Sequence, residues 1–219
     1  MAKEISRFLL PFQEGQVFSA MRDKIHYAKS ILYVSRFLLL KPNESTESSM
    51  KLVVGKMSRI FIFKQSKFLS FAFPLFVDIE KEEVLAIRSR WGVNIDSEII
   101  SKCFEILNDE NFLHNPSLTG FYFRQQSPND AVFNLLEEII MFEPCYIRYD
   151  FDKERANGRR HPLYHLDVNY SDYGNFKMGL DEALLNDNFE DILNIETDCA
   201  YLQDAFKKTL RKPLILAKK

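Results

Sequence analysis

Residues 145–170 read CYIRYDFDKERANGRRHPLYHLDVNY, two stretches of alternating polarity on either side of a short basic segment. Successive side chains of a strand point to opposite faces, so residues 145–151 and 162–170 are each predicted to be a strand with one apolar and one polar face. Asn157-Gly158 between them favours a tight turn. The whole stretch therefore predicts an antiparallel β-hairpin.

The polar faces of the two strands are expected to coincide, because their apolar faces must share one core. One register that does this places Asp152 opposite His161 and Arg148 opposite His165, with Asp150 diagonal to both histidines. A slip by one residue would bury half of these charges and is disfavoured. A slip by two residues keeps the faces together and stays open.

This polar face gathers residue types that can carry acid–base chemistry. An imidazole exchanges protons near neutral pH, a carboxylate orients it, and an arginine holds a phosphate or an oxyanion. The candidate catalytic residues are Arg148, Asp150, His161 and His165. The candidate nucleic-acid-binding residues in the connecting loop are Arg155, Arg159 and Arg160. The alternative is structural, since one face of an antiparallel sheet is commonly solvated.

No metal or other cofactor is expected at this hairpin. His161 and His165 lie four residues apart, which on a strand separates them by about 13 Å. His165 and Asp167 could share an ion, but a third ligand is not evident. The sequence also has no phosphate-binding loop, dinucleotide fingerprint, Gly-x-Ser-x-Gly elbow or His-Glu-x-x-His motif, and only 7 glycines.

The remaining chain reads as a mixture of helices and strands. The segments predicted to be helical are 16–40, 80–91, 96–107 with Asp96 as N-cap, a helix opened by Ser127-Pro128, 188–194 and 197–210. The segments predicted to be strands are 60–63, 68–77 broken by Pro74, 120–124 and 175–178. The polar, Ser-rich stretch 41–49 is predicted to be an exposed loop. Together these predict one α+β domain over 1–219, with a helical N-terminal part packed on a small, mainly antiparallel sheet and C-terminal helices.

Composition limits the partners and the compartment. The formal net charge is −2 and the pI about 6.1, so any nucleic acid would have to bind through a local basic loop. Three widely spaced cysteines, Cys103, Cys145 and Cys199, form no disulfide framework or zinc motif, and all three lie in apolar stretches. We expect a cytoplasmic protein without a membrane-spanning segment.

The hairpin resembles a bacterial family known only as domain of unknown function 2290. The similarity is carried by Arg148-Tyr149-Asp150-Phe151-Asp152, a basic loop and His161-Pro162-Leu163-Tyr164-His165-Leu166, followed by a strand at 175–179 and a helix at 189–193. A looser likeness links the Arg-Tyr-Asp and histidine cluster to the C-terminal part of TumE-type toxins. The first resemblance implies no known reaction, and the second implies a growth-inhibiting toxin that acts on RNA.

Two functions follow as expectations. The first is a bacterial accessory protein, a subunit of a defence or toxin–antitoxin-type system that acts through a protein partner. The absence of enzyme motifs and the many Phe and Tyr residues favour it. The second is a small nuclease-like enzyme or toxin that uses the Arg/Asp/His residues of the hairpin.

Overall fold

The computed structural model describes residues 3–19, 21–40, 45–56, 58–169 and 176–197. Its contacts divide the chain into two compact units, residues 1–184 and residues 185–219. The first unit holds all the described strands and helices α1 to α6. The second holds helix α7 (Asn186–Leu193). The C-terminal helix predicted at 197–210 lies almost entirely outside the described residues.

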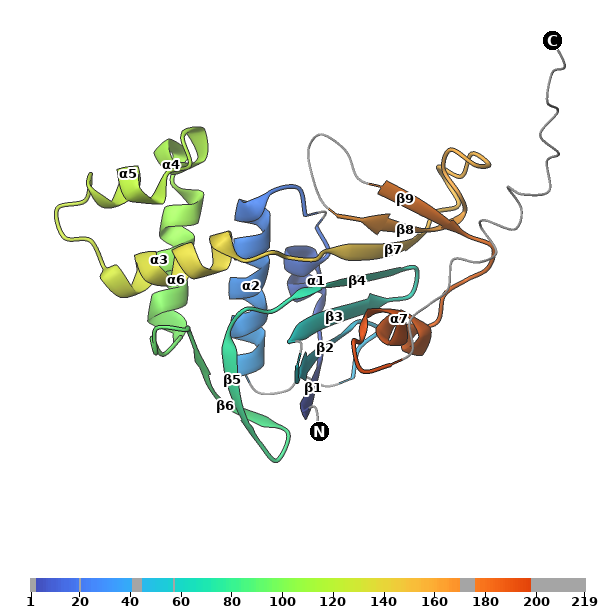
Figure 1. The fold of residues 1–219 in the computed structure, drawn as a ribbon, viewed down its shortest axis with the longest axis horizontal. Helices are drawn as coiled ribbons and strands as arrows, with labels where there is room; N and C mark the ends of the chain where they lie inside the picture. Colours follow the sequence, from blue (N-terminus) through green and yellow to red (C-terminus); the bar gives the residue numbers. More distant parts are fainter. Residues whose placement is uncertain (1–2, 20, 41–44, 57, 170–175, 198–219) are drawn as a thin grey trace, which may run out of the picture. The chain divides into compact units, whose positions relative to one another are not determined.

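Within the described residues the fold is α+β, as predicted, and its sheet is an antiparallel meander (Figure 1). Seven strands lie in the order β1-β2-β3-β4-β7-β8-β9, and every neighbouring pair is antiparallel. Their bounds are β1 (Lys3–Phe8), β2 (Ser49–Val54), β3 (Arg59–Lys64), β4 (Lys67–Ala72), β7 (Ile147–Phe151), β8 (Tyr164–Val168) and β9 (Phe176–Leu180). The sheet is larger than predicted, because β1 and β2 carry no clear alternation and were not predicted.

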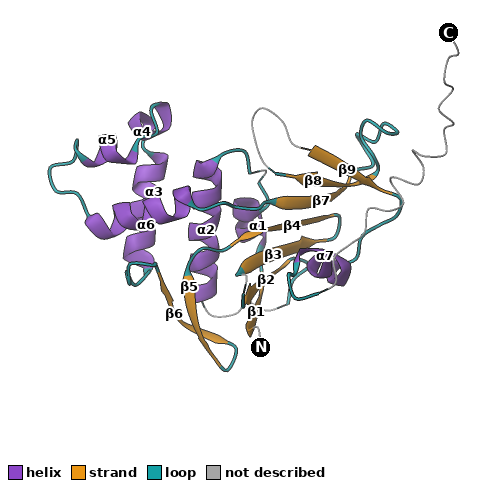
Figure 2. Cartoon of the chain, viewed as in Figure 1, coloured by secondary structure: helices purple, strands orange, loops and turns teal. Residues whose placement is uncertain are grey.

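The chain between β4 and β7 forms a separate hairpin and a helical layer (Figure 2). The hairpin consists of β5 (Phe76–Glu80) and β6 (Glu83–Arg88). The helices of this insertion are α3 (Ser97–Asn108), α4 (Glu110–His114), α5 (Leu118–Tyr122) and α6 (Asp130–Met141). They follow α1 (Pro11–Val17) and α2 (Lys24–Leu39), and α2 contacts α1, α3, α6 and β6.

One face of the sheet joins the main core through α2. Tyr27 of α2 packs edge-on against Phe71 of β4, and its hydroxyl donates to the Ala72 carbonyl at 2.9 Å. Ile62 and Leu69 on the same sheet face are fully buried in this core. This face continues across β7, β8 and β9, where it becomes polar.

Two helix predictions were wrong in their boundaries or type. Residues 16–40 form the end of α1 and, after a break, α2, whose N-cap Asp23 accepts from the His26 backbone N–H. Residues 80–91 contain strand β6 and no helix, although Val84, Ile87 and Trp91 have helical spacing. Pairing with β5 through a turn with positive φ at Lys81 and Glu82 overrides that local pattern.

The insertion contains one further error and one confirmation. Residues 120–124, predicted to be a strand, largely form helix α5, because the Ser117 side chain caps the Gly120 N–H. The next helix starts at Asp130 with Asn129 as N-cap, two residues after the predicted Ser127 cap. Helix α3 and its cap Asp96 are confirmed.

The predicted exposed loop 41–49 is shorter than expected. Residues 41–44 lie outside the described residues. Ser45 and Glu47 are exposed, whereas Ser48 is buried and Ser49 already belongs to β2. The Thr46 hydroxyl lies 2.9 Å from both the Leu9 and Ser48 carbonyl oxygens. The end of this loop is therefore fixed to the sheet.

Candidate functional site

Strands β7 and β8 form the predicted antiparallel hairpin, but their register differs by two residues from the one named from the sequence. Arg148 lies opposite Asp167, and Asp150 lies opposite His165. The apolar faces coincide in either register, so polarity alone cannot choose between them. The observed register sets opposite charges directly across from each other, which stabilises a cross-strand pair.

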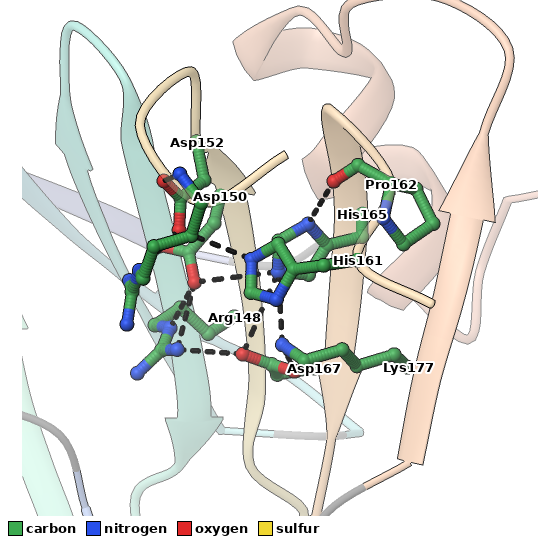
Figure 3. Close-up of polar contacts among 9 residues, drawn as sticks. Arg148, Asp150, Asp152, His161, Pro162, His165, Asp167 and Lys177 are labelled. Atoms are coloured by element: carbon green, nitrogen blue, oxygen red, sulfur yellow. Dashed lines mark hydrogen bonds and ion pairs between the residues drawn. The ribbon is translucent and has the colours of Figure 1, made fainter. Parts of the chain in front are cut away.

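Strand β9 adds a third member to each of these pairs, so the polar face consists of two cross-strand rows (Figure 3). Arg148, Asp167 and Lys177 form the first row. Asp150, His165 and Gly179 form the second row. We call Arg148, Asp150, His165, Asp167 and Lys177 the sheet cluster.

The central members of the sheet cluster are buried, so they do not form the solvated face that was one possibility for this hairpin. Asp150 is 2% exposed, and His165 and Asp167 are 0% exposed. The Arg148 Nη2 atom bridges the two carboxylates, at 2.7 Å from Asp150 Oδ2 and 2.6 Å from Asp167 Oδ2. Two buried anions are thus held together by one guanidinium.

Lys177 supplies the second cation. Its Nζ atom lies 2.6 Å from Asp167 Oδ1 and 3.0 Å from His165 Nε2. The other ring nitrogen of His165, Nδ1, lies 2.8 Å from the Pro162 carbonyl oxygen. A carbonyl only accepts and an ammonium only donates, so these two contacts fit the tautomer of His165 that carries its proton on Nδ1 and directs its Nε2 lone pair into the cluster.

The hairpin loop covers the second row. Gly179 makes this possible, because a Cβ atom there would lie 2.8 Å from Pro162 Cγ. His161, at the end of the loop, packs edge-on against His165 with ring centroids 4.7 Å apart. His161 and His165 are therefore in edge-on contact, although they lie four residues apart along the chain.

His161 forms a second, more accessible ionic group with Asp152. Its Nε2 atom lies 3.1 Å from Asp152 Oδ2, and its side chain is 21% exposed. Arg155 contacts the same carboxylate oxygen at 2.8 Å. Arg159 and Arg160 are exposed in the same loop. Of the three candidate nucleic-acid-binding arginines, Arg155 thus contacts the partner of a candidate catalytic histidine, and the other two are exposed in the same loop.

Burial and charge act in opposite directions on the cluster carboxylate Asp167. Desolvation raises its pKa, but the hydrogen bond from Lys177 and the charges of Arg148 and Lys177 outweigh desolvation and leave the pKa lowered. Asp167 is therefore ionised at neutral pH.

The four predicted catalytic residues meet in this region, and two further members were missed. Asp167 was placed on the polar face and considered only as a possible metal ligand with His165, and Lys177 was recognised only as part of a strand. The position of Lys177, two residues before Gly179, did not indicate on which face of the sheet its side chain lies. The structure also supplies Asp150 as a third potential ligand beside His165 and Asp167, the element that the metal argument lacked.

The protein-family models, the curated proteins and the solved structures contain no match to this chain. The likeness of the hairpin to domain of unknown function 2290 and to TumE-type toxins therefore stays a prediction. In the described part of the chain, no helix combines the length and hydrophobicity needed to cross a bilayer.

Proposed function

We propose that the chain is a small nuclease-like hydrolase whose active site comprises the sheet cluster and the neighbouring His161–Asp152 pair. The observation that carries this proposal is the burial of two carboxylates and an imidazole on one patch of sheet, in contact with two partly exposed cations. Replacing a buried ionic network by apolar side chains is often neutral or stabilising. Fixed charges in a site of low dielectric constant are, in contrast, what transition-state stabilisation requires.

His161 is suited to proton transfer. It is partly exposed, so a substrate can reach it, and Asp152 orients its ring at 3.1 Å. The fully buried His165 stands behind it in edge-on contact. In this proposal His161 exchanges a proton with the substrate, and His165 holds the position of the cluster.

The cations suit a phosphodiester. Arg148 and Lys177 retain 20% and 29% side-chain exposure, more than the carboxylates they contact. A guanidinium binds phosphoryl oxygens in a bidentate manner, and a lysine binds them as a point charge. Exposed Arg155, Arg159 and Arg160 would contact the flanking phosphates of a nucleic acid.

The test is cleavage of labelled single-stranded RNA and of single- and double-stranded DNA by purified protein, with and without Mg²⁺ or Mn²⁺. His161→Gln should lower the rate by about 10²–10⁴-fold, as expected for a general acid or base. His26→Gln is the matched control, because His26 is also partly exposed and lies 3.0 Å from an aspartate, Asp23. Wild-type protein that cleaves none of these substrates, or His161→Gln with full activity, contradicts the proposal.

A second candidate, the accessory protein that binds a protein partner, is favoured by an apolar groove between the start of helix α2 and the helical insertion. The groove has a volume of about 600 Å³. Exposed Leu113 and Met141 line it together with Ile25, Phe112 and Ile140. Exposed apolar patches of this kind mark protein interaction sites.

A biological assay, such as growth inhibition or phage protection by the native operon, distinguishes the two functions. If partner binding is the function, Met141→Glu should abolish the phenotype and His161→Gln should leave it intact. Leu85→Glu is the control, because Leu85 is another large, exposed apolar residue and lies outside the groove. The opposite pattern favours the hydrolase.

A further inference from the structure

We propose that Asp150, His165 and Asp167 bind a divalent cation of the Mn²⁺ or Zn²⁺ type. One potential ligand atom from each residue lies within 4.8 Å of those of the other two. The proposal deepens the proposed function and rests on it for its biological meaning, but binding of the ion can be measured without any substrate.

The ligand distances are close to those of a metal site. His165 Nε2 lies 3.8 Å from Asp150 Oδ2 and 3.9 Å from Asp167 Oδ2. Two ligands about 2.0–2.1 Å from a tetrahedral ion are about 3.3 Å apart. These two separations need to contract by about half an ångström, and the separation between the Asp150 and Asp167 ligand atoms, which is within 4.8 Å, must also approach this value for the three groups to hold one ion.

His165 has the support typical of a metal-binding histidine. Its Nδ1–H donates to the Pro162 carbonyl at 2.8 Å, which fixes the ring orientation and leaves the Nε2 lone pair for an ion. Metal-bound histidines almost always donate their second ring nitrogen to a carbonyl or carboxylate in this way. The hydrogen bond to Pro162 therefore orients the His165 ring in the same way as the corresponding hydrogen bond does in metal centres.

An unpartnered buried oxygen is the second, independent observation. Asp150 is 2% exposed, and its Oδ2 atom accepts from Arg148. Its Oδ1 atom is buried and has no hydrogen-bond partner among the described residues. Such an atom is energetically unfavourable in the absence of a ligand, and a cation that binds both oxygens of the Asp150 carboxylate would satisfy it.

The ammonium of Lys177 contacts two of the three groups that would hold the ion, the imidazole of His165 and the carboxylate of Asp167. The flexible, partly exposed side chain of Lys177 can turn outward when an ion binds. The two carboxylates and the two cations balance each other in the ion-free cluster. A divalent ion would make the cluster net positive, which would attract an anionic phosphodiester.

The experiment is titration of the full chain with Mn²⁺, followed by electron paramagnetic resonance and calorimetry. One ion should bind to the wild type. Lys177→Met should bind about tenfold or more tightly, because the competing charged hydrogen bonds are gone. This gain cannot arise from misfolding. His165→Ala should lose at least about 100-fold in affinity, since even outer-shell partners contribute 10–100-fold.

Asp78→Asn is the matched control, because Asp78 is an aspartate paired with an arginine, Arg88, in the separate β5–β6 hairpin, and it should leave Mn²⁺ binding unchanged. The proposal is overturned if neither the wild type nor Lys177→Met binds Mn²⁺ at millimolar concentration. Binding of equal affinity in folded His165→Ala also overturns it. Nucleic-acid cleavage in chelator without Mn²⁺ binding contradicts the metal site alone, and Mn²⁺ binding without cleavage contradicts the hydrolase alone.

Discussion

Arg148 and Asp167 lie directly opposite each other on strands β7 and β8, with the guanidinium Nη2 atom 2.6 Å from the carboxylate Oδ2. Asp167 is fully buried, and the same nitrogen also contacts buried Asp150. The pair therefore differs from the exposed ion pair of Arg155 with Asp152 in the same hairpin. Arg148 and Arg155 are therefore expected to make very different contributions to the free energy of unfolding.

Arg148→Ala should lower the free energy of unfolding by about 3–5 kcal/mol, because it leaves two buried carboxylates without their shared cation. Arg155→Ala should change it by only about 0–1 kcal/mol, since the Arg155 side chain is 68% exposed. Equilibrium unfolding in urea, monitored by circular dichroism, measures both. Equal and small effects of the two substitutions would show that the Arg148 network contributes little.

Substitutions of the two neighbouring histidines, His165 and His161, should lower the free energy of unfolding by different amounts. His165→Ala removes a buried ring and the hydrogen-bond partner of both Lys177 and the Pro162 carbonyl, so a loss on the order of 2–4 kcal/mol is expected. His161→Gln, at a partly exposed position, should cost less than about 1 kcal/mol. Urea unfolding of both variants checks this, and the reverse ranking would contradict the described burial.

The measured ranking also decides how activity data are interpreted. Activity lost in His165→Ala could reflect unfolding alone, because that ring is fully buried. His161→Gln keeps the cluster and its packing, so lost activity with unchanged stability points to chemistry. His161 is therefore the more informative of the two candidate catalytic histidines.

The hairpin was predictable because a period of two residues defines a strand locally, and Asn157-Gly158 defines the turn region. The register of the hairpin was not predictable, because a slip by two residues leaves every side chain on the same face. The choice depends on cross-strand charge pairs such as Arg148 with Asp167 and on the third strand, β9. The role of Lys177 appears only once that strand is in place.

Local patterns failed where tertiary pairing overrides them. Residues 84, 87 and 91 have helical spacing, yet β6 pairs with β5. The burial of Asp150 and Asp167 was also inaccessible from the sequence, because a polar face and a buried charged cluster show the same alternation. The loop containing His161 and Pro162 covers that face. Pro162 can pack there because strand β9 has a glycine, Gly179, at the point of contact.

Thiol reactivity tests the placement of two cysteines, one of which differs from expectation. Cys103 is buried, and burial raises the pKa of its thiol to about 12. Cys145, expected in apolar surroundings, is exposed and has a φ of +46° at the start of the hairpin. Because the thiolate is the reactive form, Cys145 should react with Ellman's reagent in native protein and Cys103 only after unfolding.

The measurement uses a Cys199→Ser background, since Cys199 lies outside the described residues. One thiol should titrate rapidly under native conditions and a second should appear in denaturant. Adding Cys145→Ser should abolish the rapid phase. Rapid reaction of both thiols at neutral pH would contradict the burial of Cys103.

Gly179 provides a test of how the loop holds the site without changing any charged residue. A Cβ atom at this position would lie 2.8 Å from Cγ and 3.2 Å from Cβ of Pro162. Gly179→Ala should therefore displace Pro162, weaken the His165 Nδ1 hydrogen bond to its carbonyl and lower Mn²⁺ affinity by about 10–100-fold, as outer-shell changes do. Gly15→Ala is the control, because nothing lies within 4 Å of a Cβ there and alanine favours helix α1 by about 0.5–1 kcal/mol. Calorimetric Mn²⁺ titration and urea unfolding measure both variants. Unchanged Mn²⁺ affinity in a folded Gly179→Ala protein would mean that the Pro162 carbonyl does not position His165 for the ion.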